Sequence, residues 1–174
     1  MQKVSNSSSK SLTRLLRHTF CMPILFNRWL NKDVKAELTA KIAQAEKGHN
    51  GEIVLVIENH LPLNQAYHIG CRERAIRVFS HYKVWDTEHN TGILIYLNLR
   101  ERNLQIIADR GINQKVSPDT WQNLCQETLV YFKKQEMQTG LITLIDAASQ
   151  ILKTHYPSAD PQGNELDNTV IVLK

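Results

Sequence analysis

The sequence predicts an α/β fold, a three-layer α/β/α sandwich with a mixed sheet of about four strands and helices on both faces. Two observations support this prediction. Three short segments, 52–57, 93–97 and 104–108, are rich in aliphatic and β-branched residues, as strands buried on both faces are. Longer segments before, between and after them carry apolar residues at helical spacing, with charged residues on the opposite side.

Composition divides the 174 residues into three parts. Residues 1–30 carry five basic and no acidic side chains, and we expect this basic leader to be partly disordered or a docked helix. Residues 31–157 form the α/β domain, which is large enough to bury a core without disulfides. Residues 158–174 form a C-terminal tail whose apolar end can add an edge strand.

The leader leaves three interpretations open. Its apolar part, within residues 12–30, is too short and too often interrupted by charge to span a bilayer. It is therefore a helix docked on the domain, an arm lying on an anionic membrane surface, or a targeting segment. Without the leader the chain carries no net positive charge, which argues against nucleic-acid binding and leaves an unidentified protein as the expected partner.

Cysteine usage indicates the compartment. Cys21, Cys71 and Cys125 are far apart and match no metal-binding or redox spacing. We therefore expect the thiols to be buried and reduced. Because disulfides are rare where glutathione keeps thiols reduced, we expect the protein to be cytoplasmic, and it could also be attached to the surface of a membrane.

The first half of the domain is predicted to be a helix–strand–helix–strand unit. Residues 33–47 form an amphipathic helix, and Gly48 marks its end. The strand 52–57 follows, and a second helix is expected at 65–82. Strand–helix–strand connections of this kind are right-handed crossovers, so the strands 52–57 and 93–97 should be parallel.

The strands 93–97 and 104–108 are joined by a short charged segment, which predicts an antiparallel hairpin with its turn in water. If Asn98 lies opposite Asn103, then Ile93 lies opposite Ala108. This register brings the loop before the first strand beside the loop that follows the second.

The second half of the domain is predicted to be helical. Residues 117–119, Ser-Pro-Asp, supply an N-cap, a proline at the first helical position and an acid in the first turn. Trp121 and Phe132 belong to the apolar side of this helix and are assigned to the core. Residues 138–140 are expected to separate this helix from a last helix, and Pro157 ends that last helix.

The hairpin register and the crossover rule together gather polar side chains at one end of the sheet. Carboxylate and amide oxygens are the ligands of hard cations, so the sequence predicts a Ca²⁺ or Mg²⁺ site there. The predicted ligands are Glu52, Asp86, Glu88, Asn90 and Asp109. Arg110 and Gly111 are assigned to the same site as neighbouring residues of the loop after the second strand.

Two alternatives remain at this stage. In the purely structural one, Asp86 caps a turn and Asp109 pairs with a nearby arginine. In the other, the functional residues lie at the opposite end of the sheet, with Glu58, His60 and Arg102, because ligands in open α/β sheets bind where the parallel strands end.

Several separated segments also resemble one family. They are GEIVLVIE, RERAIRVFS, VWDTEHNTGILIYL, R-x-L-Q-I-I-A-DRGI, the helix with Trp121 and Phe132, Gly140-Leu141 and HYP. In this order they resemble the TPM domain, a family named after a thylakoid-lumen phosphatase, a photosystem-repair protein and a nematode receptor modulator. The basic leader and the segment Glu165-Leu166-Asp167 are similar to its short bacterial branch. The resemblance implies an α/β/α fold.

The resemblance leaves two functions open. Members of the family have been described as acid phosphatases, as calcium binders, and as assembly or repair factors. The first hypothesis is a binding or assembly module with a divalent cation at the acidic end of the sheet. The second is a metal-assisted acid phosphatase, active on phosphomonoesters, that uses the same residues. Longer members carry an Asn-Asp-x-Ala-Gly-Leu segment before the first helix, whereas this chain has RWLNKDVK there.

Overall fold

The computed structural model describes residues 29–61, 69–158 and 165–173 and shows a mixed four-stranded sheet. Its strands, in the order β3-β2-β1-β4 across the sheet, are β1 (Ile53–Glu58), β2 (Ile93–Asn98), β3 (Asn103–Ala108) and β4 (Ile171–Leu173). Strand β1 is parallel to both β2 and β4, and β2 is antiparallel to β3. The leader was predicted for residues 1–30, and its residues 1–28 lie outside the described residues.

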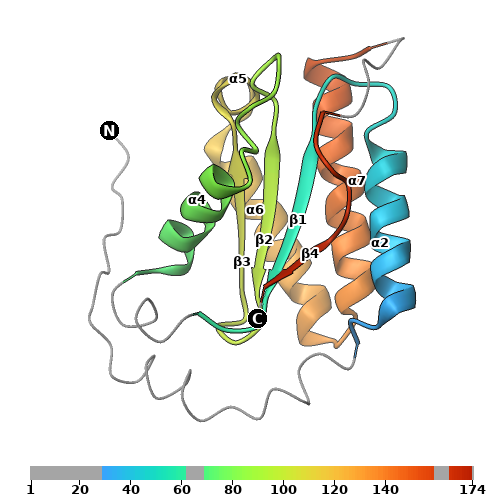
Figure 1. Cartoon of the computed structure of the whole chain (residues 1–174), viewed down its shortest axis with the longest axis vertical. Helices are drawn as coiled ribbons and strands as arrows, with labels where there is room; N and C mark the ends of the chain where they lie inside the picture. Colours follow the sequence, from blue (N-terminus) through green and yellow to red (C-terminus); the bar gives the residue numbers. More distant parts are fainter. Residues whose placement is uncertain (1–28, 62–68, 159–164, 174) are drawn as a thin grey trace.

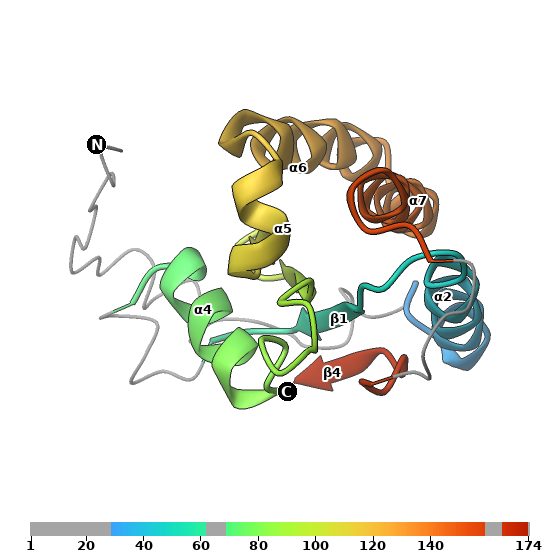
Figure 2. The same ribbon diagram turned by 90° about the horizontal axis from the view of Figure 1, so that it is seen from above.

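Helices cover both faces of this sheet (Figures 1 and 2). One face carries α2, α6 and α7, with the short α5 at one end, and the other carries α4. The α/β sandwich predicted from the sequence is therefore confirmed. The helices of the described residues are α2 (Lys32–Ala45), α4 (Cys71–His81), α5 (Arg110–Lys115), α6 (Pro118–Lys133) and α7 (Met137–His155).

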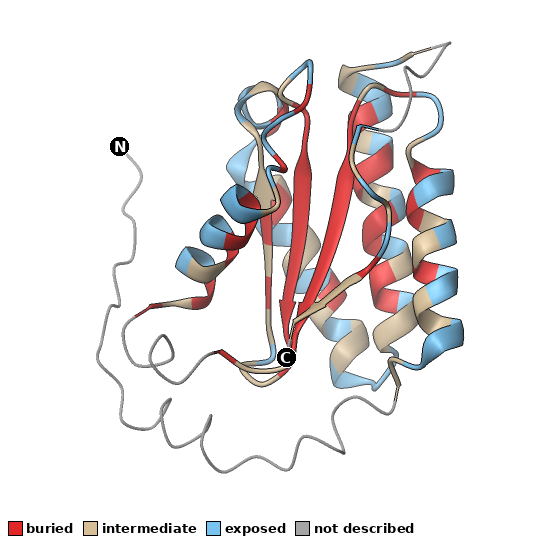
Figure 3. Ribbon diagram, viewed as in Figure 1, coloured by how far each residue is buried: buried red, intermediate tan, exposed pale blue. Residues whose placement is uncertain are grey.

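The two central strands are buried along their whole length (Figure 3). Alternate residues of each strand point to opposite faces, so β1 and β2 contribute to two apolar clusters. Leu55 and Ile95 lie in the larger cluster under α2, α6 and α7, whereas Val56 and Tyr96 lie in the smaller one under α4. This double burial explains why both segments are continuously apolar in the sequence.

The predicted hairpin register is confirmed. Ile93 pairs with Ala108 and Asn98 pairs with Asn103, so the loops at the two ends lie beside each other as expected. The predicted cap of α6 is also present, since the Ser117 side chain accepts a hydrogen bond from the Asp119 N–H.

Three predicted boundaries were wrong. Helix α7 begins at Met137, because the break after α6 falls at residues 134–136, where Gln135 has a φ of 65°. Gly140 lies inside α7, and a Cβ there would stand 2.9 Å from the Tyr131 Cβ. Helix α5 begins at Arg110, so Arg110 and Gly111 are helical rather than part of a loop. Helix α4 begins at Cys71 and residues 69 and 70 are not helical, whereas residues 65–68 of the helix expected at 65–82 lie outside the described residues.

The two aromatic residues assigned to the core differ in burial. Trp121 is buried, and Phe132 is half-buried at the edge of the larger cluster. In the described ranges, no helix combines the length and the apolar character needed to cross a membrane.

Gly92 fixes how the chain enters β2. A Cβ at this position would lie 1.8 Å from the Val84 carbonyl oxygen, which belongs to the backbone and therefore moves little. The Gly92 carbonyl oxygen also accepts a hydrogen bond from the Asp109 N–H, at 2.9 Å. Close backbone packing at Gly92 thus holds the loop before β2 against the end of β3.

We expect Gly92→Ala to destabilise the protein by about 3 kcal/mol, because the added methyl group forces the backbone around Val84 to move. Gly70→Ala is the matched control, since a Cβ there meets no atom within 4 Å. Urea unfolding of both variants measures the effect. Equal stability of the two variants would show that the contact with Val84 yields easily.

Candidate functional site

Asp109 lies where β3 ends and α5 begins. It is the N-cap of α5, and its Oδ1 accepts a hydrogen bond of 2.7 Å from the Arg110 N–H. Aspartate is a preferred N-cap because its carboxylate satisfies an otherwise unpaired backbone donor. Its second oxygen, Oδ2, is buried and has no hydrogen-bond partner in the described part of the chain.

The segment 86–91, hereafter loop 86–91, packs directly onto this helix start. The Asn90 carbonyl oxygen accepts hydrogen bonds from the Gly111 and Ile112 N–H groups. A Cβ on Gly111 would lie 2.5 Å from the His89 carbonyl oxygen and 2.6 Å from that of Asn90, so glycine is required for this approach. Arg110 Nε also donates to Asn90 Oδ1, at 2.9 Å. The structure therefore brings Asn90, Asp109, Arg110 and Gly111 together.

The carboxyl group of Glu52 is directed to the C-terminal tail. Its Oε1 accepts a hydrogen bond from the Glu165 N–H at 3.2 Å, and its Oε2 accepts one from the Leu166 N–H at 3.4 Å. Burial raises the pKa of Glu52, and the nearby Glu165 contributes in the same direction. The acidic neighbour that acts on this carboxyl group is therefore Glu165 of the tail.

The other two predicted ligands, Asp86 and Glu88, are exposed on loop 86–91. Backbone hydrogen bonds hold them, from the Asp86 N–H to the Lys83 carbonyl oxygen and from the Glu88 N–H to Glu165 Oε2. Among the described residues, no group of three histidine, cysteine, aspartate or glutamate side chains is arranged to hold a metal ion. Any cation here would therefore take part of its ligands from backbone or amide oxygens.

Sequence reasoning missed Tyr156 beside this loop, at the end of α7. The His89 ring stacks on the Tyr156 ring with centroids 6.4 Å apart, and Lys115 Nζ lies 4.0 Å from the Tyr156 centroid. The Tyr156 hydroxyl would be 3.1 Å from a Cβ on Gly111. Only the tertiary fold brings these positions together, and no local pattern in the sequence indicates it.

A second carboxyl group, Glu46 at the end of α2, lies next to Glu52. The negative charge of Glu52 acts on the Glu46 carboxyl group. Glu46 Oε1 also accepts the Ile53 N–H, at 2.8 Å. Burial, followed by repulsion from Glu52, raises the pKa of Glu46 from 4.5 to about 8.

This raised pKa predicts how stability depends on pH. Between about pH 4.5 and pH 8 the folded protein holds a proton on Glu46 that the unfolded chain releases, so the free energy of unfolding falls as pH rises through this window. We expect Glu46→Gln to weaken the decline, and Glu127→Gln, at an exposed position on α6, to leave it unchanged. Denaturant unfolding from pH 5 to pH 9 measures the slopes, and equal slopes in wild type and Glu46→Gln would contradict the assignment.

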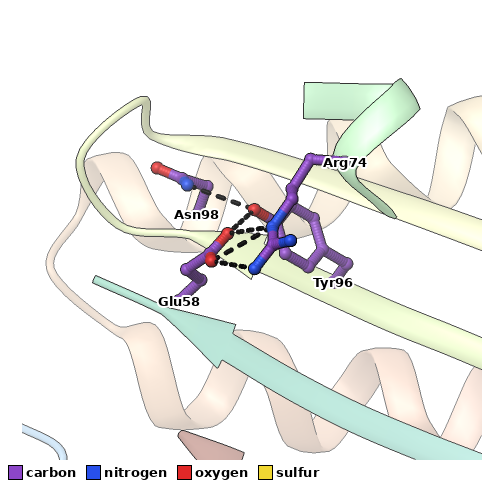
Figure 4. A network of polar contacts seen from close by, with 4 residues as sticks. All are labelled: Glu58, Arg74, Tyr96 and Asn98. Atoms are coloured by element: carbon purple, nitrogen blue, oxygen red, sulfur yellow. Dashed lines mark hydrogen bonds and ion pairs between the residues drawn. The ribbon is translucent and has the colours of Figure 1, made fainter. Parts of the chain in front are cut away.

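The opposite end of the sheet holds a buried polar network at the ends of β1 and β2 (Figure 4). The Glu58 carboxylate accepts hydrogen bonds from Arg74 Nε at 3.1 Å, from Arg74 Nη2 at 2.6 Å, and from the Tyr96 hydroxyl. Asn98 Nδ2 donates to the Tyr96 oxygen at 3.2 Å. The Glu58 and Arg74 side chains are only 1% and 18% exposed.

These contacts commit Glu58 to a structural role. Its charge is neutralised by Arg74 of α4, and burial followed by the adjacent Glu58 carboxylate raises the pKa of Tyr96. Both oxygens of the carboxylate are already hydrogen-bonded, so the group ties α4 to the sheet. The network supplies no free ligand oxygen for the competing site predicted at this end.

We expect Arg74→Met to destabilise the protein by about 3–5 kcal/mol, because it leaves a buried carboxylate unpaired. Arg77→Met is the control, since Arg77 pairs with Glu73 on the surface of the same helix and such pairs contribute at most about 1 kcal/mol. Thermal or urea unfolding compares the two. A loss below about 1 kcal/mol in Arg74→Met would show that Glu58 is solvated or protonated instead.

Two solved structures are similar to this fold. The BA42 protein of the psychrophilic bacterium Bizionia argentinensis has a similar solution structure, with a TM-score of 0.72 and 28% sequence identity over 82% of this chain and 94% of that one. The N-terminal domain of a P. gingivalis protein shares the fold at a TM-score of 0.57 and 16% identity, covering 75% of this chain and 82% of that one.

Comparison with curated proteins found no match. The family model of the TPM domain matches residues 26–151, which is more than half of the chain and includes strands β1, β2 and β3. The chain therefore belongs to the TPM domain family.

Proposed function

We propose that this protein is a binding module that holds a divalent cation, Ca²⁺ or Mg²⁺, where loop 86–91 meets the start of α5, and that this surface engages a protein partner. We call this surface the cation rim. It consists of Asp109, Asn90 and the rest of loop 86–91. Glu52 is left out of the proposed ligand set because both oxygens of its carboxyl group accept hydrogen bonds from the tail.

The free oxygen of Asp109 is the observation that carries the proposal. A buried carboxylate oxygen without a hydrogen bond is costly unless something compensates it, and a bound cation does so. The carbonyl oxygens of His89 and Asn90 both approach Gly111, two residues from Asp109. Carboxylate and carbonyl oxygens are the ligands that Ca²⁺ and Mg²⁺ take, so the chemistry of these groups fits a hard cation.

The hydroxyl groups of loop 86–91 and the Cys125 thiol are poor candidates for a nucleophile, which favours a binding function over covalent catalysis. The Thr91 hydroxyl donates to the Asn50 carbonyl oxygen, and the Thr87 hydroxyl oxygen accepts the Thr91 N–H, so both hydroxyls of the loop are engaged. Burial raises the pKa of the Cys125 thiol to about 11, which keeps it protonated and poorly nucleophilic.

The second candidate function is metal-assisted hydrolysis of a phosphomonoester at the same rim. Arg110 favours it, because its exposed guanidinium donates to Asn90 Oδ1 at this rim and is suited to binding a phosphoryl group. Both functions need a cation at Asp109, so a single set of variants separates them.

We expect Ca²⁺ or Mg²⁺ to raise the melting temperature of the wild-type protein, and Asp109→Asn to lose most of this shift. Asparagine is as good an N-cap as aspartate, so the substitution removes the ligand charge while keeping the start of α5. Asp119→Asn, in the first turn of α6, is the matched control. Calorimetric titration and amide chemical shifts of residues 86–92 and 109–112 measure binding.

A phosphomonoester assay under the same conditions distinguishes the two functions. A cation-dependent melting shift without turnover supports the binding module. Turnover that vanishes in Asp109→Asn and persists in Asp119→Asn supports the phosphatase. Equal cation binding by wild type and Asp109→Asn would contradict both.

A further inference from the structure

We infer that the C-terminal tail orders loop 86–91 through Glu165, so that docking of the tail and cation binding at the rim reinforce each other. The tail is residues 165–173 here. The effect on the cation rests on the proposed function, whereas the ordering of the loop does not.

Glu165 connects three segments that are far apart in the sequence. Its Oε2 accepts a hydrogen bond of 3.1 Å from the Glu88 N–H, at the tip of loop 86–91. Its own N–H donates to Glu52 Oε1, just before β1. The acceptor that holds the loop is therefore itself positioned by the first residues of the sheet.

The same part of the sheet anchors the loop at its other end. The Glu52 carbonyl oxygen accepts the Ile93 N–H at 2.8 Å, and the Asn50 carbonyl oxygen accepts the Thr91 hydroxyl at 2.6 Å. These bonds fix residues 91–93, at the C-terminal end of the loop. The bond from Glu88 to Glu165 fixes its middle, so tail and sheet hold different parts of the loop.

The far end of the tail is seated independently of Glu165. Strand β4 pairs with β1 from Val56 to Glu58, and the Asn59 N–H donates to the Leu173 carbonyl oxygen. Val170 is buried, and Ile171 packs against the smaller apolar cluster. Substitution of Glu165 should thus loosen the loop while β4 stays in place, which makes Glu165 a positioning residue with a separable effect.

Charge gives the coupling a second component. The Glu165 carboxylate accepts the Glu88 N–H, so a docked tail places a negative charge against the backbone of loop 86–91. A cation at the rim is attracted by this charge. By linkage, any gain in cation affinity from a docked tail equals the gain in tail docking from a bound cation.

The test uses the full chain and begins without metal. We expect Glu165→Ala to lower the heteronuclear NOE of the amides at 86–91 and to shift the Glu88 amide, with the Ile171 and Leu173 methyl signals unchanged. Glu165→Gln should restore loop order, because its amide oxygen accepts the same N–H. Asp167→Asn, an exposed acid two residues along the tail, should behave as wild type.

The second measurement is a Ca²⁺ titration of the same proteins. We expect Glu165→Ala to weaken binding at least about fivefold, the lower end of usual coupling between sites, and Asp167→Asn to change it little. Unchanged loop order in Glu165→Ala overturns the inference, as does wild-type Ca²⁺ affinity in a variant whose loop is loosened. If the wild-type protein binds no cation, the proposed function fails, and the metal-free comparison still decides whether the tail orders the loop.

Discussion

The strand pairing around Ile93, the first residue of β2, positions the cation rim. Ile93 pairs with Ile53 on one side and with Ala108 on the other, and these pairings bring the ends of three strands to one place. Gly92 allows the approach because it has no side chain against Val84. The position of Asp109 at the start of α5, and the contact of loop 86–91 with it, both depend on this register.

The two ends of the sheet carry carboxylates in different states. At the carboxyl ends of β1 and β2, Glu58 is buried and paired with Arg74, so its charge is used to hold α4. At the other end, Asp109 keeps one oxygen without a partner in the described residues, and burial raises the pKa of both Glu46 and Glu52. Ligands usually bind where parallel strands end, but here that end is closed by an ion pair.

Backbone features were predictable from the sequence, and side-chain directions were not. The hairpin register follows from the length of a charged turn between two apolar runs, and the α6 cap follows from Ser117 and Pro118. The same reasoning placed Glu52 near loop 86–91, but its carboxyl group is held by the tail, a contact across more than a hundred residues. Likewise, the sequence predicted a helix break at Gly140. This glycine instead lies inside α7, where it packs closely on Tyr131, and that contact depends on the tertiary fold.

The central claim is that the cation site lies where loop 86–91 meets α5. Paramagnetic Mn²⁺, added in small amounts to the ¹⁵N-labelled protein, tests it directly, because it broadens the amide signals nearest to its binding site. The account predicts selective broadening at Asn90, Asp109 and Gly111, with Asn59 and Leu99 at the opposite end of the sheet unaffected. Selective broadening at that opposite end, or none at Asp109, would contradict it.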